Sequence, residues 1–145
     1  MLGGERRGAP PAGGAAQSAT VTRVVDGDTV ILSAAGRSRL IGIDTPEVHG
    51  AGECYGREAS AFAKRLLTGR RVSYRLGAEQ RDRYGRALVY LRLPDGRFVN
   101  ELLVARGFAR PLAIAPNTRY AEPFRELAAA ARAAGRGLWS ARACG

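Results

Sequence analysis

The sequence predicts an α+β protein in which a five-stranded β-barrel is combined with three helices. Five short segments rich in β-branched or aliphatic residues are separated by turns, which is the pattern of strands. Three further segments repeat apolar residues at helical spacing. One of these helices falls between the third and the fourth strand, which is the element order of an OB-fold barrel.

The folded domain is expected at residues 19–141. Residues 1–18 are rich in Gly, Ala and Pro and have no periodicity, so we expect them to be disordered. They also lack the apolar centre of a signal peptide, and no apolar run in the chain approaches the length of a membrane span. Residues 142–145 are expected to form a short tail.

The first three strands form a predicted β-meander. Residues 19–25 (ATVTRVV) are mostly β-branched, and residues 29–32 (TVIL) follow them after an Asp-Gly-Asp turn. After a second turn at Ala35 and Gly36, residues 38–43 predict the third strand.

A helix, two strands and two helices complete the predicted order. Gly69 is placed to end the first helix, whose apolar positions are Ala59, Phe62, Ala63, Leu66 and Leu67. Residues 71–76 and 87–93 predict the last two strands. Residues 98–106 predict a short helix closed by Gly107. The third helix ends at Gly135, and its apolar stripe consists of Tyr120, Phe124, Leu127, Ala128 and Ala131.

The charge balance of the chain favours a polyanionic partner. Among 145 residues, 23 are Lys or Arg and 13 are Asp or Glu, which gives a net charge of +10. A surface of this charge attracts nucleic acid. Lys64 is the only lysine, however, and an arginine bias of this kind also arises from genome composition. Charge alone therefore leaves nucleic-acid contact open.

Two cysteines, Cys54 and Cys144, lie far apart in the sequence. They are too few for a zinc site. They either form one disulfide, which suits an oxidising compartment, or are two unrelated thiols. A secreted or periplasmic location is the favoured expectation. A cytoplasmic one stays open, because no signal peptide is seen in this chain.

Three polar clusters interrupt the predicted strands: DGDT at 26–29, DTPE at 44–47 and DRYGR at 82–86. Each has an ordinary explanation by itself. Asp and Gly favour turns, a Thr-Pro pair is typical of a helix start, and the third cluster suits a solvated loop. Their combination is more informative, because all three lie at strand ends.

Together the clusters supply the groups that phosphodiester hydrolysis requires. Asp28 and Asp44 offer hard carboxylate oxygens suited to calcium or magnesium, and Glu47 is near enough in sequence to hold a water beside such an ion. Arg39 and Arg86 offer forked donors that match phosphate oxygens and offset charge that grows in the transition state. Since Asp28 and Asp44 both lie at strand ends of one meander, we expect them to meet at one rim of the barrel.

The chain resembles the staphylococcal nuclease (thermonuclease) family from about residue 19 to residue 140. The segments that carry the resemblance are VVDGDTV (24–30), RLIGIDTPE (39–47), YGREASAF (55–62), DRYGRALVY (82–90), VNELLVARGFA (99–109) and GLWS (137–140). The resemblance implies an OB-fold and a monomeric, calcium-dependent nuclease. It would act on DNA and RNA, with single-stranded or frayed regions preferred, and leave 3′-phosphate products by breaking the bond to the 5′ oxygen.

The resemblance also implies a set of cation ligands. Asp28, Asp44 and the carbonyl of Thr45 would hold calcium, and Asp26 would lie behind these ligands.

Further roles carried by the resemblance concern the substrate. Glu47 would act on the attacking water, while Arg39 and Arg86 would grip the phosphate. Arg83, at a position usually occupied by lysine, and Tyr84 would contact the terminal phosphate of the substrate.

The chain departs from the family pattern in three places. Residues 110–115 (RPLAIA) lack the tyrosines on which a base stacks, and base stacking on an aromatic ring contributes about 1–3 kcal/mol per base. The loop at residues 48–53 is short and rich in glycine. Cys54 and Cys144 are additional, and we predict that they form a disulfide. Two other residues receive structural interpretations: His49 as a loop residue and Trp139 as a core anchor.

The strongest rival function is a non-catalytic OB-fold module that binds nucleic acid. Carboxylates repel phosphates, so a pure binding module has no reason to keep Asp28, Asp44 and Glu47 beside two arginines. A basic protein that acts on membranes is the third alternative. It is disfavoured, because no helix combines a basic face with an apolar face beyond what a core needs.

Overall fold

The computed structural model describes residues 15–144. Its elements, in chain order, are β1 (Gln17–Asp26), β2 (Thr29–Leu32), β3 (Gly36–Leu40), β4 (Gly42–Asp44), α1 (Gly56–Leu67), β5 (Arg71–Arg81), β6 (Ala87–Arg92), α2 (Val99–Ala105), β7 (Arg110–Leu112), α3 (Ala121–Ala134), a 3₁₀ turn (Gly137–Trp139) and α4 (Ala141–Cys144). None of the helices in this range is long and apolar enough to cross a membrane.

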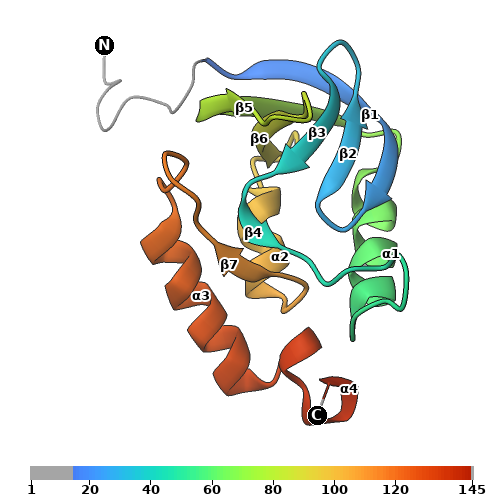
Figure 1. The fold of residues 1–145 in the computed structure, drawn as a ribbon, viewed down its shortest axis with the longest axis vertical. Helices are drawn as coiled ribbons and strands as arrows, with labels where there is room; N and C mark the ends of the chain where they lie inside the picture. The colour runs from blue at the N-terminus through green and yellow to red at the C-terminus, as the bar shows by residue number, and fades with distance from the viewer. Residues whose placement is uncertain (1–14, 145) are drawn as a thin grey trace.

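Five strands close into a barrel in the order β1-β2-β3-β6-β5, which confirms the predicted fold class. The β3–β6 pair is parallel, and the other pairs are antiparallel. Figure 1 shows the barrel in the upper part of the molecule, with α3 and α4 below it. Closure leaves no free barrel edge, so the rims and their turns are the places where polar side chains gather.

The core fills the barrel and continues beneath it. Val21, Leu40 and Leu91 are fully buried inside the barrel wall, and Leu67 of α1 is buried against it. Phe124 of α3 is the largest fully buried side chain. Since α3 packs on α2, β4 and β7, the helices hold the strand that leaves the barrel and leads into the polar rim.

The prediction of the third strand was wrong in one respect, because residues 38–43 do not form one continuous strand. The extended segment is interrupted between β3 and β4. There Gly42 adopts φ +81°, and a Cβ on Gly42 would lie 2.9 Å from the Phe124 ring. Only glycine tolerates both conditions. The strand β4 then pairs with β7, so that Asp44 lies opposite Arg110 in a separate two-stranded sheet.

Two other boundaries differ from the expectation. Most of the segment predicted to be disordered lies outside the described residues. Gln17 and Ser18 instead begin β1, because they pair with Tyr74 and Ser73 of β5. The strand β5 also continues to Arg81, past a register irregularity after Leu76, and so reaches the rim that carries the third polar cluster.

Candidate active site at the barrel rim

 One small pocket at the rim collects seven of the predicted site residues. The pocket has a volume of about 210 Å³. That is room for an ion and several waters, since one water needs only about 15 Å³. The predicted residues that line it are Asp26, Asp28, Arg39, Asp44, Thr45, Glu47 and Arg86.

The turn between β1 and β2 presents Asp28 to this pocket. A register irregularity between Val24 and Asp26 bends the end of β1, and the Asp26 carboxylate accepts a hydrogen bond of 3.1 Å from the backbone N–H of Asp28. Between them, Gly27 lies so close to Thr45 that a Cβ would be 2.7 Å from its hydroxyl oxygen. The Asp-Gly-Asp sequence thus allows the second polar cluster to pack directly on the first.

The Asp28 carboxylate is buried, with a side-chain exposure of 10%. Its Oδ2 accepts a 3.0 Å hydrogen bond from the backbone N–H of Thr45, and its Oδ1 accepts one of 3.3 Å from the Thr29 hydroxyl. These bonds fix the orientation of Asp28 and tie the two chain segments together.

Arg39 lies between the two carboxylates. Its Nη2 is 3.4 Å from Asp28 Oδ2 and 3.4 Å from Asp44 Oδ1. Its Nη1 donates to the carbonyl oxygens of Leu40 and Ile43, which holds the guanidinium in place from the backbone side. Because one nitrogen faces both carboxylates, Asp28 and Asp44 converge on a single region of the pocket.

The charged forms of the Asp28 and Asp44 carboxylates are both disfavoured in the folded protein. Burial raises the pKa of Asp28, although the Arg39 cation opposes the shift. Burial also raises the pKa of Asp44, and the negative charge of Asp28 raises it further. The protein therefore holds two anionic groups together with incomplete compensation, an arrangement that a bound cation relieves.

The disfavoured charge of Asp44 predicts that Asp44→Asn stabilises the protein at neutral pH. The folded state raises the pKa of Asp44 above its ordinary value of 3.8, so ionisation disfavours folding above that pH and not below it. We expect a gain in the free energy of unfolding at pH 7 that shrinks toward pH 4. The gain stays below about 1 kcal/mol, because solvent screens this half-exposed side chain. Thermal unfolding without calcium at both pH values measures it.

Asp95→Asn is the matched control, with the opposite sign. Hydrogen bonds from the Arg97 backbone and side chain lower the pKa of Asp95, so losing this carboxylate is expected to destabilise the protein at neutral pH. An Asp44→Asn variant that is less stable than the parent at pH 7 would contradict the repulsion argument.

The third cluster supplies Arg86, and here the structure adds a residue that the sequence analysis missed. Asp82 Oδ2 accepts a 2.8 Å hydrogen bond from Arg86 Nε, and Asp82 Oδ1 accepts bonds from the backbone N–H groups of Tyr84 and Arg86. Burial by itself raises the pKa of Asp82, but the bonds from Arg86 outweigh it and lower the pKa. Asp82 thus holds the Arg86 guanidinium by its Nε and orients the two terminal nitrogens, Nη1 and Nη2.

Arg83 and Tyr84 are placed outside the acidic pocket. They line a neighbouring pocket of about 300 Å³, which shares Arg39 and Arg86 with the first. Arg83 Nη2 donates a 2.8 Å hydrogen bond to the Tyr84 hydroxyl, and Tyr84 is 70% exposed. The two residues predicted to contact the substrate, Arg83 and Tyr84, therefore lie beside the acidic pocket. They line the pocket that shares Arg39 and Arg86 with it.

The wall of this second pocket includes Leu112 and Ile114, which are exposed apolar side chains. They occupy the segment in which the sequence lacks tyrosines. Trp139, expected to anchor the core, is only half-buried. The guanidinium groups of Arg110 and Arg132 lie 5.0 Å and 5.6 Å from the centre of its ring. His49 lies exposed in the loop, as expected.

The structure contains the predicted disulfide between Cys54 and Cys144, whose Cα atoms are 5.7 Å apart. It joins the loop after Glu47 to α4 at the C-terminal end of the chain.

The fold and the pocket together define a class of protein: a small α+β barrel whose rim brings carboxylates and arginines together in one pocket. Comparison with known proteins agrees with this class. Residues 37–141 match the family model described as "Staphylococcal nuclease homologue", and the chain belongs to the staphylococcal nuclease family.

Individual relatives support the assignment. The thermonuclease of Staphylococcus hyicus is 38% identical over 130 residues, which cover 86% of this chain and 76% of that protein. The thermonuclease of Staphylococcus intermedius is 43% identical over 110 residues, 72% of this chain and 65% of that protein. Endonuclease YncB of Bacillus subtilis is 35% identical over 114 residues, 73% of this chain and 54% of that protein. The chain is accordingly a hydrolase of the phosphodiesterase class.

Proposed function

We propose that this chain is a calcium-dependent nuclease that hydrolyses phosphodiester bonds of DNA and RNA at the 5′ oxygen and leaves 3′-phosphate products. The observation that carries the proposal is the rim pocket, in which two carboxylates, a further glutamate and two arginines face one small volume. Membership of the nuclease family supports the same reaction class.

The donor set of the pocket fits calcium. Asp28 and Asp44 supply hard oxygen ligands. Burial is the main cause that raises the pKa of both carboxylates, and a neighbouring aspartate adds to it in each case. The Thr45 carbonyl would be the third protein ligand. Within residues 15–144, no cluster of three or more His, Cys, Asp or Glu side chains is arranged to hold a metal. Water and substrate oxygens would therefore complete the six to eight ligands that calcium takes.

Bound calcium would supply Lewis-acid polarisation of the phosphoryl group. The chain's own residues would do the rest. Glu47 lies at the exposed side of the pocket, where its carboxylate can orient a water and accept its proton. Arg39 and Arg86 would bind the phosphate oxygens and offset the charge that grows on them. Arg83 and Tyr84 would contact a terminal phosphate in the neighbouring pocket.

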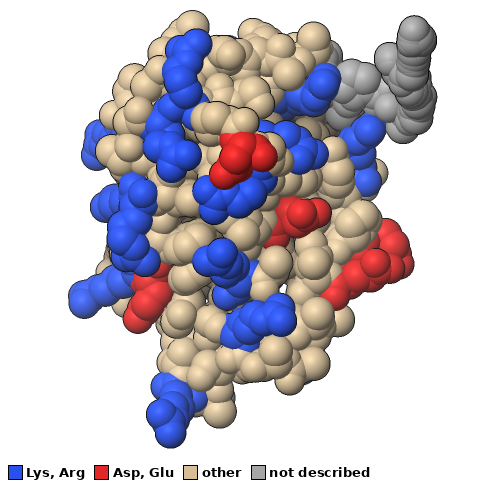
Figure 2. Space-filling model, turned by 180° about the vertical axis from the view of Figure 1, so that it is seen from behind, with Lys and Arg blue, Asp and Glu red and all other residues tan. Residues whose placement is uncertain are grey.

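The surface charge suits a polynucleotide substrate. The chain carries a net charge of +10, and Figure 2 shows basic side chains spread widely over the face opposite to that of Figure 1. A surface of this charge attracts a phosphate backbone. A monomer acting on single-stranded or frayed DNA and RNA is the form that we propose.

The apolar wall of the second pocket bears on base preference. Leu112 and Ile114, which is 63% exposed, offer contact area to a base but no aromatic face. Stacking on an aromatic ring contributes about 1–3 kcal/mol per base, so we expect weak affinity for free nucleotides and little discrimination among bases.

The disulfide supports a location outside the reducing cytosol. Disulfides persist in oxidising compartments, so a secreted or periplasmic location is the one that we propose.

The test is incubation of the purified protein with single-stranded DNA and, separately, single-stranded RNA, with calcium and with a chelator. We expect cleavage with calcium only, and products that a 3′-phosphatase makes extendable by a polymerase. A protein that shifts the DNA in a gel but leaves it intact under both conditions is the rival binding module.

A further inference from the structure

Glu47 is held by a residue that has no assigned role, Glu53. The backbone N–H of Glu47 donates a 2.7 Å hydrogen bond to Glu53 Oε1, and the backbone N–H of Glu53 donates a 2.7 Å bond to the Glu47 carbonyl oxygen. The two residues thus bond to each other in both directions. These two bonds close residues 47–53 into a ring. Glu47, the first residue of this ring, lines the acidic pocket.

The ring is compact, and it is built around its glycines. Gly52 adopts φ +74° and donates a backbone hydrogen bond of 3.2 Å to the His49 carbonyl oxygen. Gly56, at the start of α1, lies against the Glu47 carbonyl so closely that a Cβ would collide with it. The backbone of Glu47 therefore rests on the first turn of α1 on one side and on Glu53 on the other.

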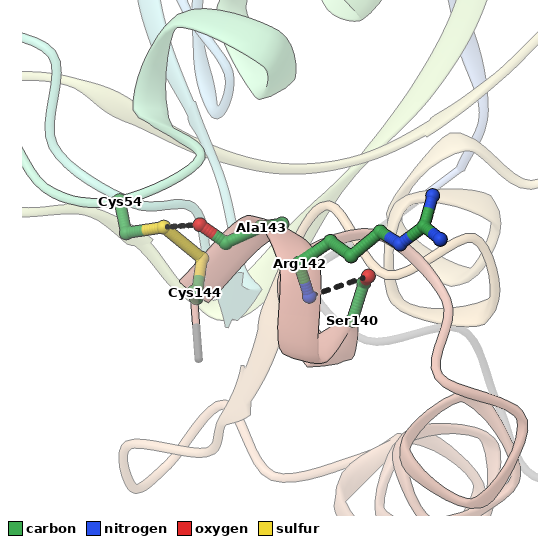
Figure 3. Close-up of a disulfide and its surroundings, with 5 residues drawn as sticks. All are labelled: Cys54, Ser140, Arg142, Ala143 and Cys144. Carbon is green, nitrogen blue, oxygen red and sulfur yellow. Dashed lines mark hydrogen bonds between the residues drawn. A yellow bond between two sulfur atoms is a disulfide. The ribbon is translucent and has the colours of Figure 1, made fainter.

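The disulfide fixes the far side of this ring. Cys54 directly follows Glu53 and is bonded to Cys144 of α4, as Figure 3 shows. The backbone N–H of Cys144 donates to the Ser140 carbonyl oxygen, and that of Leu138 donates to the Gly107 carbonyl oxygen. The loop is thereby connected to the body of the protein through its C-terminal segment.

We propose that Glu53 is a positioning residue for Glu47, and that the Cys54–Cys144 disulfide keeps Glu53 in place to do so. This inference rests on the proposed nuclease function. The negative charge of Glu53 contributes to the raised pKa of Asp44, but its hydrogen bond goes to the Glu47 backbone. Glu53 therefore acts by holding the backbone from which the Glu47 side chain extends. A catalytic group displaced by about 1 Å can lose about 100-fold in rate, so this support is expected to appear in kcat.

The first test compares Glu53→Ala with Glu53→Gln. Glutamine keeps an oxygen that accepts the Glu47 N–H, so it should retain kcat within about threefold, whereas alanine should lose about 10- to 100-fold with little change in KM. Glu58→Ala is the matched control, because Glu58 and Glu53 line one further pocket beside this loop and the variant removes the same charge from it. It should leave kcat unchanged. Unfolding curves establish that each variant is folded.

The second test removes the disulfide with the double replacement Cys54→Ser and Cys144→Ser, alone and combined with Glu53→Ala. If the disulfide acts through Glu53, its loss lowers kcat in the parent but adds little in the Glu53→Ala background. Equal losses in both backgrounds would overturn the proposed link between the disulfide and Glu53.

The outcomes separate this inference from the function on which it rests. An active parent whose Glu53→Ala variant keeps full kcat overturns the positioning role and leaves the nuclease function standing. A parent without calcium-dependent cleavage overturns the proposed function itself. A Glu53→Gln variant as impaired as Glu53→Ala would also overturn the positioning role, because it would show that Glu53 contributes its charge and not the hydrogen bond to Glu47.

Discussion

Replacing Glu47 by Gln is expected to lower kcat for single-stranded DNA by about 100-fold or more, because general acid–base groups contribute about 10²–10⁴-fold. Glutamine has nearly the size of glutamate and keeps the backbone contacts of the loop, but it cannot accept a proton from water at neutral pH. Initial cleavage rates at saturating DNA and calcium measure the effect.

Binding should survive this change. Glu47 carries negative charge beside the phosphate site, so Glu47→Gln is expected to bind an oligonucleotide as tightly as the parent, or slightly more tightly, in a fluorescence titration without calcium. Glu58→Gln serves as a control for loss of a nearby carboxylate. A Glu47→Gln variant with the kcat of the parent would reject the assigned role.

Arg86→Lys is the second change with a large expected effect, a loss of about 10²–10³-fold in kcat. Arg86 uses Nε to bond Asp82, which leaves its two terminal nitrogens for a phosphate. Lysine has one ammonium group and cannot pair with Asp82 and grip two phosphate oxygens at once. The charge is kept, so a large loss would show that geometry matters.

Arg97→Lys provides a control with the same local arrangement. Arg97 Nε also bonds an aspartate, Asp95 Oδ2, at 2.9 Å, but this pair lies outside both pockets of the rim. It should leave kcat unchanged. Near-parental activity of Arg86→Lys would assign Arg86 a structural role, in which its bond to Asp82 merely closes the loop.

The barrel was predictable from sequence because its strands are rich in aliphatic and β-branched residues and are set off by turns that contain glycine. The small sheet of β4 and β7 was not. Its second strand, Arg110–Leu112, is three residues long and contains a proline, so it has no strand pattern of its own. The break at Gly42 was likewise hidden, because the approach of Phe124 that requires glycine comes from a distant helix.

Site residues that act through the chemistry of their side chains were predictable from the sequence. Residues that act through backbone contacts were not. Carboxylates and arginines at strand ends pointed to Asp28, Asp44 and Arg86. Glu53 acts through the backbone N–H of another residue, and no sequence spacing marks such a bond. Asp82 had a usable signal, since it precedes Arg86 by four residues within one loop.

The central claim is that Asp28 and Asp44 share one cation. Isothermal titration calorimetry of calcium into the parent, Asp28→Asn and Asp44→Asn proteins tests it directly, with Asp95→Asn as the control. We predict one site in the parent and in the control, and an affinity at least about tenfold lower in each of the other two variants, because each removes a charged ligand. Calcium binding of parental strength in both variants would contradict the account.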